Sequence, residues 1–183
     1  MRVITGTARG RKLAAPEGLD TRPTSDMAKE AMFSIVQFEV QGAEVLDLFA
    51  GSGQLGIEAL SRGARRATFV DSSREAHAVI QQNLRKTELS QGARVLQSDA
   101  SAFLNTSRDR FDLAFLDPPY GQGIPEAVLP LVAARMRPGG VILCETGRDE
   151  TLPDFAGDFT RKREYFYGRA KVTTYRRPEE DPT

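Results

Sequence analysis

The chain of 183 residues has a single cysteine, Cys144, which excludes a disulfide within one molecule. Cys144 lies in the apolar run GGVILCE, where a lone thiol is usually part of the core. A protein without disulfides suits a reducing compartment. No apolar run approaches the length of a membrane-spanning helix, and the start MRVITGTARG lacks the apolar segment of a signal peptide. We therefore expect a soluble, cytoplasmic protein.

Histidine is equally scarce, because His77 is the only one in the sequence and falls in the middle of a predicted helix. We find no Ser-His-Asp or Cys-His arrangement of the kind that nucleophilic catalysis uses. Nor do the Cys, His, Asp and Glu residues show the spacing of a metal-binding cluster. These absences argue against a serine or cysteine hydrolase, and we expect no metal ion.

The sequence has no excess of either charge, since 25 Lys and Arg balance 25 Asp and Glu. This balance at first argues against a nucleic-acid partner, but the basic residues are unevenly spread. The first twelve residues carry four basic side chains and no acid, and residues 161–177 carry seven against Glu164 alone. If both segments converge in space they would attract phosphates. The alternative is a solvated strand face and a flexible arm.

Apolar runs alternate with helical patterns along most of the chain. Continuous apolar runs, typical of strands buried on both faces of a parallel sheet, occupy residues 43–49, 66–71, 93–99, 111–117 and 138–145. Helical patterns occupy residues 24–38, 53–63, 74–89, 100–106 and 125–136. Two β-rich runs flank Gly168 and predict an antiparallel hairpin. Together they predict an α/β fold with a doubly wound, mostly parallel, seven-stranded sheet.

The N-terminal segment differs from the rest. Residues 1–23 are rich in Gly and Arg with little periodicity, and we expect a short strand at residues 2–6 followed by a loop. We interpret residues 1–23 as a basic arm or small subdomain and residues 24–178 as the main domain. In the first predicted helix, Met27 and Met32 are expected to be core residues.

A glycine-rich loop follows the first core strand. In VLDLFAGSGQLGIEAL, Gly51, Gly53 and Gly56 form a GxGxxG pattern at the start of a helix, where the backbone can approach an anionic ligand closely. Asp71 ends the next strand about twenty residues later, as expected of an acid that binds ribose hydroxyls. By itself this pattern also fits a nicotinamide-dependent dehydrogenase.

Three further carboxylates favour a different ligand. Asp47, just before the loop, suits a cationic, amino-bearing ligand better than a pyrophosphate. Asp99 ends the third strand and could accept a hydrogen bond from an adenine amino group. Asp117 ends the fourth strand. Each aspartate alone could be a helix N-cap, but with Asp71 four carboxylates line one crevice, which tolerates a sulfonium better than a pyrophosphate.

The fourth strand ends in Asp117-Pro118-Pro119-Tyr120, which resembles the [DNS]-P-P-[YFW] motif of class I S-adenosylmethionine-dependent methyltransferases acting on exocyclic amino groups of nucleobases. The carboxylate of Asp117 and the carbonyl of Pro118 can accept both N–H bonds of such an amino group and direct its lone pair at the methyl group. The prolines hold that carbonyl stiffly. Tyr120 offers a ring on which the base can stack.

Four blocks together narrow the resemblance to the bacterial 16S rRNA guanine-N2 methyltransferase family: RVITGTARGRKL, TRPTSD, VLDLFAGSGQLGIEALSRGA and FLDPPY. One departure is Met27, where the family pattern has an arginine. The resemblance implies S-adenosylmethionine as cofactor and small-subunit rRNA as partner. It implies cofactor contacts from Asp47, Phe49, Gly51, Gly53, Asp71, Ser72, Asp99 and Ala100. It implies that Asp117, Pro118 and Tyr120 present the guanine and that Arg9, Arg11, Lys12 and Arg22 bind RNA phosphates.

Other functions remain open at this point. Adenine-N6 methylation of DNA or RNA would use nearly the same active-site chemistry. A non-catalytic RNA-binding or assembly protein could retain the same fold. Arg22 could instead form a salt bridge with Asp20 or Asp26. We also expect a monomer, because no long apolar stripe is left over after the helices and strands are placed.

Overall fold

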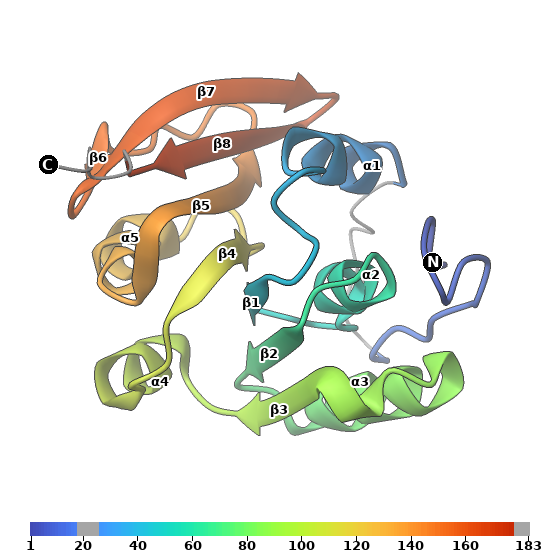
Figure 1. Ribbon diagram of the computed structural model, residues 1–183. Coiled ribbons are helices and arrows are strands. Elements are labelled where there is room, and N and C mark those ends of the chain that lie inside the picture. The colour runs from blue at the N-terminus through green and yellow to red at the C-terminus, as the bar shows by residue number, and fades with distance from the viewer. Residues whose placement is uncertain (18–25, 178–183) are drawn as a thin grey trace, which may run out of the picture.

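The computed structural model describes residues 1–17 and 26–177 and contains one sheet with helices on both faces (Figure 1). The predicted RNA-binding residue Arg22 lies outside these ranges. The strands are β1 (Glu44–Leu48), β2 (Arg66–Asp71), β3 (Ala93–Gln97), β4 (Phe111–Leu116), β5 (Met136–Gly147), β6 (Phe155–Ala156), β7 (Phe159–Tyr167) and β8 (Ala170–Arg176). Their order is β3-β2-β1-β4-β5-β8-β7-β6.

Strands β1 to β5 pair in parallel, whereas β8 is antiparallel to both β5 and β7. The predicted doubly wound sheet with a C-terminal hairpin is therefore confirmed. The strand count differs, because the described sheet has eight strands rather than seven. The additional strand is β6, which pairs only with the start of β7. Two residues are too few to show a period in the sequence.

Helices α1 (Asp26–Ile35), α2 (Gln54–Ser61) and α3 (Arg74–Thr87) cover one face of the sheet, and α4 (Ala100–Thr106) and α5 (Ile124–Ala133) cover the other (Figure 1). A short 3-10 turn, η1 (Ser90–Gly92), precedes β3. None of the helices in the described ranges has the length and hydropathy needed to cross a membrane.

The expectation for the two methionines of α1 is half correct. Met32 is 1% exposed, but Met27 is 65% exposed. Five positions correspond to about 140° around an α-helix, so these residues cannot share one narrow face. The helix buries Ala28, Met32 and Phe33 and turns Met27 outward. It also ends at Ile35, three residues before the predicted boundary.

Alternate residues of β1 belong to the two cores that flank the sheet. Val45 lies in the core under α1, α2 and α3, whereas Leu46 and Leu48 lie in the core under α4 and α5. Successive side chains of a strand point to opposite faces. Asp47 is therefore on the same face as Val45, beneath α2.

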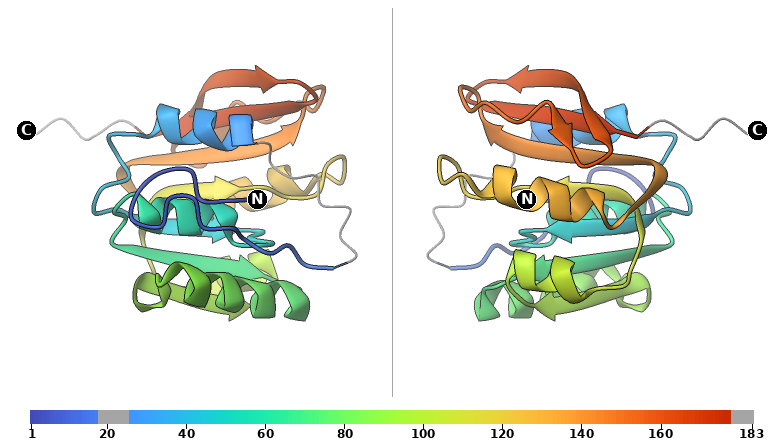
Figure 2. Two further views of the ribbon diagram at one scale, coloured as in Figure 1. Left: turned by 90° about the vertical axis from the view of Figure 1, so that its right-hand side faces the viewer. Right: turned by 90° about the vertical axis from the view of Figure 1, so that its left-hand side faces the viewer.

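The N-terminal arm, residues 1–17, packs on the core instead of extending from it. Val3, Ala8 and Leu13 are buried in the core under α1 to α3. The strand predicted at residues 2–6 is wrong, since the only β pairing there is an isolated bridge between Arg2 and Lys12. Figure 2 shows the arm lying across the outer side of α2.

Buried polar groups of α2 hold the arm in place. Glu58 is fully buried, and its carboxylate accepts hydrogen bonds from the Ile4 N–H (2.9 Å) and the Thr5 N–H (3.1 Å). Ser61 Oγ accepts a hydrogen bond from the Ala8 N–H (2.9 Å) and donates one to the Thr5 carbonyl (2.7 Å). Because these groups are satisfied only when the arm is seated, they make it part of the folded domain.

Candidate active site

The carboxyl ends of β1, β2, β3 and β4 lie at one edge of the sheet, because the four strands are parallel neighbours. This edge carries the carboxylates of Asp47, Asp71, Asp99 and Asp117. The Asp117 N–H donates to the Leu48 carbonyl (3.5 Å), so the segment after β4 begins beside the loop that follows β1. The topology thus brings the predicted cofactor loop and the predicted catalytic segment together.

Asp71 fixes the shape of the glycine loop. Its Oδ2 accepts a hydrogen bond from the Gly51 N–H (2.9 Å), and its Oδ1 accepts one from the Ser73 N–H (2.9 Å). Gly51 has φ 57° and Gly53 φ 79°, a left-handed conformation that glycine adopts at little cost. A Cβ built on Gly51 would meet no atom within 4 Å, so the backbone there is open to a ligand.

Phe49 is the strained residue of this loop. Its φ of 63° is uncommon for a bulky residue, and such strain concentrates at functional sites. Its half-buried ring packs against the core under α4 and α5. The chain therefore turns sharply between β1 and Gly51 at a conformational cost, consistent with a loop shaped for a ligand.

Asp47 supports the glycine loop from beneath. The side chain is 1% exposed, and its Oδ2 accepts a hydrogen bond from the Gly56 N–H of α2 (2.9 Å). Burial raises the pKa of Asp47 well above its usual value of 3.8, and the charges of Asp117 and Asp71 raise it further. The Gly56 hydrogen bond opposes this rise. Asp47 thus serves as a remote cap for α2, and its contact with a cofactor stays a prediction.

The Asp47→Asn variant is expected to unfold at a higher temperature than the wild type at neutral pH. The pKa of Asp47 is higher in the native state than in the unfolded state. At pH values between these two pKa values the native state binds more protons than the unfolded state, so stability falls as the pH rises from about 4. Asparagine removes that charge and keeps an oxygen for the Gly56 N–H. In thermal melts this gain in melting temperature should shrink as the pH falls towards 4. The matched variant Asp158→Asn, at an exposed position, should show no gain. A lower melting temperature throughout would contradict this expectation.

Asp99 and Ala100 begin α4 at the same edge. Asp99 is exposed and is the N-cap of the helix, since its Oδ2 accepts the Ala102 N–H (3.0 Å). This is the simpler of the two roles expected for this aspartate. A carboxylate has further acceptor sites, so capping leaves room for a contact with an adenine amino group. Ala100 is buried, whereas Ser72, on the loop after β2, is exposed.

The segment after β4 presents its three predicted residues in different environments. Pro118 is buried, and Asp117 and Tyr120 are half-buried. The Tyr120 hydroxyl donates a hydrogen bond to Glu145 Oε1 (2.8 Å), which fixes the ring above the end of β5. Asp117 thus lies beside the loop that follows β1, whereas Tyr120 is held at the end of β5.

Sequence reasoning missed two glutamates that hold this segment. Glu145 is 3% exposed and anchors Tyr120. Glu150 accepts hydrogen bonds from the Gly121 N–H (2.7 Å) and the Gly147 N–H (2.6 Å), so it joins the two loops. A signal for Glu145 was present, because it ends the apolar run GGVILCE. Glu150 lies in a loop with no pattern.

Asn83 is a third residue that the sequence did not single out. It is fully buried on α3, and its Nδ2 donates to the Ser52 carbonyl of the glycine loop (2.9 Å) and to the Ala14 carbonyl of the arm (2.9 Å). Its Oδ1 accepts the Ala14 N–H (2.8 Å). One carboxamide therefore connects the arm to the glycine loop.

Arg9 and Arg11 of the arm lie away from the catalytic edge. The arm turns at residues 6–9 against Ser61, at the far end of α2. Arg11 is committed to α3, because it donates to the Lys86 carbonyl (2.6 Å) and pairs with Glu88 (3.0 Å). Arg9 and Lys12 are exposed. Their guanidinium and ammonium groups form no hydrogen bond or ion pair within residues 1–17 and 26–177.

Three of the seven basic residues in the C-terminal run, residues 161–177, form ion pairs. Arg161 pairs with Asp154 and Glu164, and Arg176 pairs with Glu39. Lys171 is buried and pairs with Glu164. The two interpretations of this run, a phosphate-attracting segment and a solvated strand face, both stay predictions.

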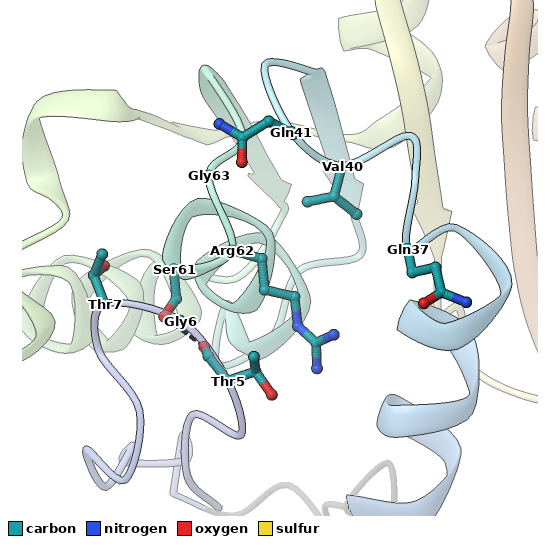
Figure 3. Close-up of a pocket in the computed structure, with 9 residues that line it drawn as sticks. All are labelled: Thr5, Gly6, Thr7, Gln37, Val40, Gln41, Ser61, Arg62 and Gly63. Atoms are coloured by element: carbon teal, nitrogen blue, oxygen red, sulfur yellow. Dashed lines mark hydrogen bonds between the residues drawn. The ribbon is translucent and has the colours of Figure 1, made fainter.

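A hollow of about 730 Å³ lies away from the carboxyl edge (Figure 3). It is formed by the arm at Thr5 and Thr7, the end of α2, and the segment after α1 that includes Gln37. Arg62 enters it, but its guanidinium is bound to Glu58 (3.0 Å) and lies over the Phe33 ring. The hollow contains none of the predicted site residues. Among the described residues, no group of three or more His, Cys, Asp or Glu could hold a metal ion.

Comparisons with known proteins agree with this architecture. The family described as Conserved hypothetical protein 95 matches residues 1–176. A putative rRNA methyltransferase, YlbH, from Bacillus subtilis is 40% identical over 97% of this chain and 99% of its own. The ribosomal RNA small subunit methyltransferase D of Escherichia coli is 34% identical over 97% of this chain and 90% of its own.

Two solved structures share the fold. A putative methyltransferase from E. coli superposes with a TM-score of 0.87 and 34% identity, over 98% of this chain and 99% of its own. A 16S rRNA N2 methyltransferase from Thermus thermophilus, solved with AdoMet and guanosine, gives a TM-score of 0.72 and 26% identity, over 89% of this chain and 45% of its own. The chain therefore belongs to the Conserved hypothetical protein 95 family, the family of the bacterial 16S rRNA guanine-N2 methyltransferases.

Proposed function

We propose that this protein transfers a methyl group from S-adenosylmethionine to the exocyclic N2 amino group of a guanine in 16S rRNA of the small ribosomal subunit. The observation that carries the proposal is the placement of Asp117 beside the glycine loop, through the hydrogen bond from its N–H to the Leu48 carbonyl. Family membership supports the same activity, because relatives are named as rRNA methyltransferases.

The residues of the loop fit S-adenosylmethionine. Gly51 offers an open backbone, and Asp71 stands at the end of β2 where ribose hydroxyls would bind. Asp47, Asp71 and Asp117 lie close enough for their charges to interact, which suits a cationic ligand. In this proposal Phe49 and Gly53 line the methionine part, with Ser72, Asp99 and Ala100 beside the nucleoside.

Asp117 and Pro118 would position the acceptor amino group. The nitrogen of a guanine amino group is a poor nucleophile, because its lone pair is delocalised into the ring. The Asp117 carboxylate and the Pro118 carbonyl would accept its two N–H bonds and aim the lone pair. Bound S-adenosylmethionine supplies the methyl group on an already activated sulfonium. Tyr120, held by Glu145, would stack on the base.

The remaining parts of the proposal concern the RNA and the cell. Residues 24–178 would form the methyltransferase domain and residues 1–23 its RNA-binding arm. Arg9 and Lys12 are exposed and suited to phosphates, whereas Arg11 is engaged with Glu88. Arg22 would be a further phosphate contact. We expect a cytoplasmic monomer that needs no metal, because placement and charge supply the catalysis.

A transfer assay tests the proposal. Purified protein is mixed with methyl-labelled S-adenosylmethionine and small ribosomal subunits from cells that lack this gene, with naked rRNA and duplex DNA in parallel. The labelled nucleoside is then identified. N2-methylguanosine from rRNA or subunits is the expected product. If the product is N6-methyladenine, the substrate is an adenine and not a guanine. If the protein binds NADH but not S-adenosylmethionine, it is not a methyltransferase.

A further inference from the structure

A pocket of about 600 Å³ lies on the β5 side of Tyr120, next to the proposed guanine site. Three segments form it: the loop after β4 with Tyr120 and Gly121, the end of β5 with residues 147–150, and the turn between β7 and β8 with residues 168–169. Its size is within the range of sites for small organic ligands. Of the candidate site residues predicted from the sequence, Tyr120 alone lines this pocket.

The strand pairing explains why the hairpin turn reaches the catalytic edge. Ala170, the first residue of β8, is in register with both Gly147, the last residue of β5, and Tyr167, the last residue of β7. The turn at Gly168 and Arg169 therefore lies at the carboxyl end of the parallel strands. The far end of the same hairpin, around Lys162 and Arg163, lies towards the opposite edge.

Hydrogen bonds make the pocket a built structure. The Arg148 N–H donates to the Arg169 carbonyl (2.8 Å), and the Arg148 guanidinium donates to the Gly168 carbonyl (3.2 Å). Glu150 joins the loop after β4 to Gly147, as described above. The Lys171 ammonium in turn donates to the Glu150 carbonyl. The walls are thus held together without a ligand.

Gly147 keeps the Tyr120 ring accessible from this pocket. A Cβ built on Gly147 would lie 3.3 Å from Tyr120 Cδ2 and 3.0 Å from Glu150 Oε2. Any side chain there would crowd the ring. Its absence leaves an aromatic surface at the pocket wall on which a nucleobase can stack.

Two exposed arginines stand at the pocket. The Arg148 guanidinium lies 4.8 Å from the centre of the Phe166 ring, and Phe166 is itself 49% exposed. Stacking on Phe166 orients the flat guanidinium while its charge stays available. Arg169 is exposed on the turn. The acids nearby are Glu150, whose oxygens accept two N–H groups, and exposed Asp149.

We propose that this pocket is a second RNA subsite, which holds the nucleotide adjacent to the target guanine, with its base against Tyr120 and its phosphate at Arg148 and Arg169. The inference rests on the proposed function, because it places the target guanine at Asp117 on one side of Tyr120. The next nucleotide of a splayed single strand then meets the other side. The subsite would give the enzyme contact with unpaired RNA at the site of chemistry.

Binding of naked 16S rRNA, in the presence of S-adenosylhomocysteine, tests the subsite in the full-length protein. Arg148→Ala and Arg169→Ala are each expected to weaken RNA binding several-fold and to lower the slope of log affinity against log salt by about 0.7–0.9. Affinity for S-adenosylhomocysteine should not change. Arg148→Lys keeps the charge but not the flat face, so it should keep the salt slope while binding more weakly.

Lys162→Ala and Arg163→Ala are the matched controls, because they remove the same charge from the far end of the same hairpin. If all four alanine variants bind equally well, or if the salt slope is unchanged in Arg148→Ala and Arg169→Ala, the subsite inference is wrong. Wild-type methyl transfer is measured on the same RNA. Absence of product from the wild type would reject the proposed function separately, and the binding comparison would still decide whether the pocket holds RNA.

Discussion

Replacing Asp117 by alanine is expected to lower the rate of methyl transfer by about 10²–10³-fold, the usual cost of removing one preorganised polar contact from a reaction centre. The carboxylate would accept an N–H bond from the target amino group, and without it the lone pair is no longer aimed at the methyl group. Binding of S-adenosylmethionine should change little, because the loop around Gly51 is held by Asp71. Single-turnover transfer and calorimetric cofactor binding measure the two effects.

Asp117→Asn is the matched comparison. Its carboxamide oxygen can still accept an N–H bond, and asparagine is allowed at this position of the motif, so it should retain far more activity than Asp117→Ala. An alanine variant with more than a tenth of the wild-type rate would show that Asp117 does not hold the amino group. Equal loss in both variants would point to the charge instead of the acceptor oxygen.

The second large effect is expected at Glu58, which links the arm to α2. Its buried carboxylate binds the Ile4 and Thr5 N–H groups and the Arg62 guanidinium (3.0 Å). Lys29 is also fully buried, and its ammonium donates to the Arg2 carbonyl (2.7 Å). Burial lowers the pKa of Lys29, and the charge of Glu58 opposes that lowering. Glu58 therefore compensates a buried positive charge.

Glu58→Ala is expected to lower the free energy of unfolding by about 3–5 kcal/mol, because it leaves buried donors and a buried ammonium without their carboxylate. The loss should diminish as pH rises. A native Lys29 pKa below 10.5 means that the unfolded state binds more protons between the two values, so stability increases with pH there. Urea unfolding at neutral and alkaline pH measures both effects.

Two further variants separate charge from packing. Glu30→Ala removes an exposed carboxylate from α1 and should change stability little. The double variant Lys29→Met with Glu58→Gln removes both buried charges. Its loss of unfolding free energy should be smaller than the sum of the losses in the two single variants. A loss below about 1 kcal/mol in Glu58→Ala, the range of a surface ion pair, would contradict this account.

The sequence by itself predicted the parallel part of the sheet and the residues of the candidate site. Continuous apolar runs marked β1 to β5, and residues with a fixed chemical requirement marked the loops: glycines where the chain turns sharply and Asp-Pro-Pro-Tyr after β4. Such signals are local, because a strand buried on both faces must be apolar and a left-handed turn favours glycine. These signals did not predict the two-residue strand β6 or the exposed position of Met27, since neither changes the local pattern.

Only the tertiary structure decided which basic side chains are already engaged in ion pairs and which are available to a ligand. Arg11, Arg161 and Arg176 look like Arg9 and Arg169 in the sequence, yet the first three form ion pairs and the side chains of the other two form none within the described residues. The pairing depends on partners far along the chain, such as Glu39 for Arg176. The same holds for Asn83, which meets Ser52 and Ala14 only after folding. Contacts between distant segments are set by the packing of helices on the sheet, and no local pattern encodes them.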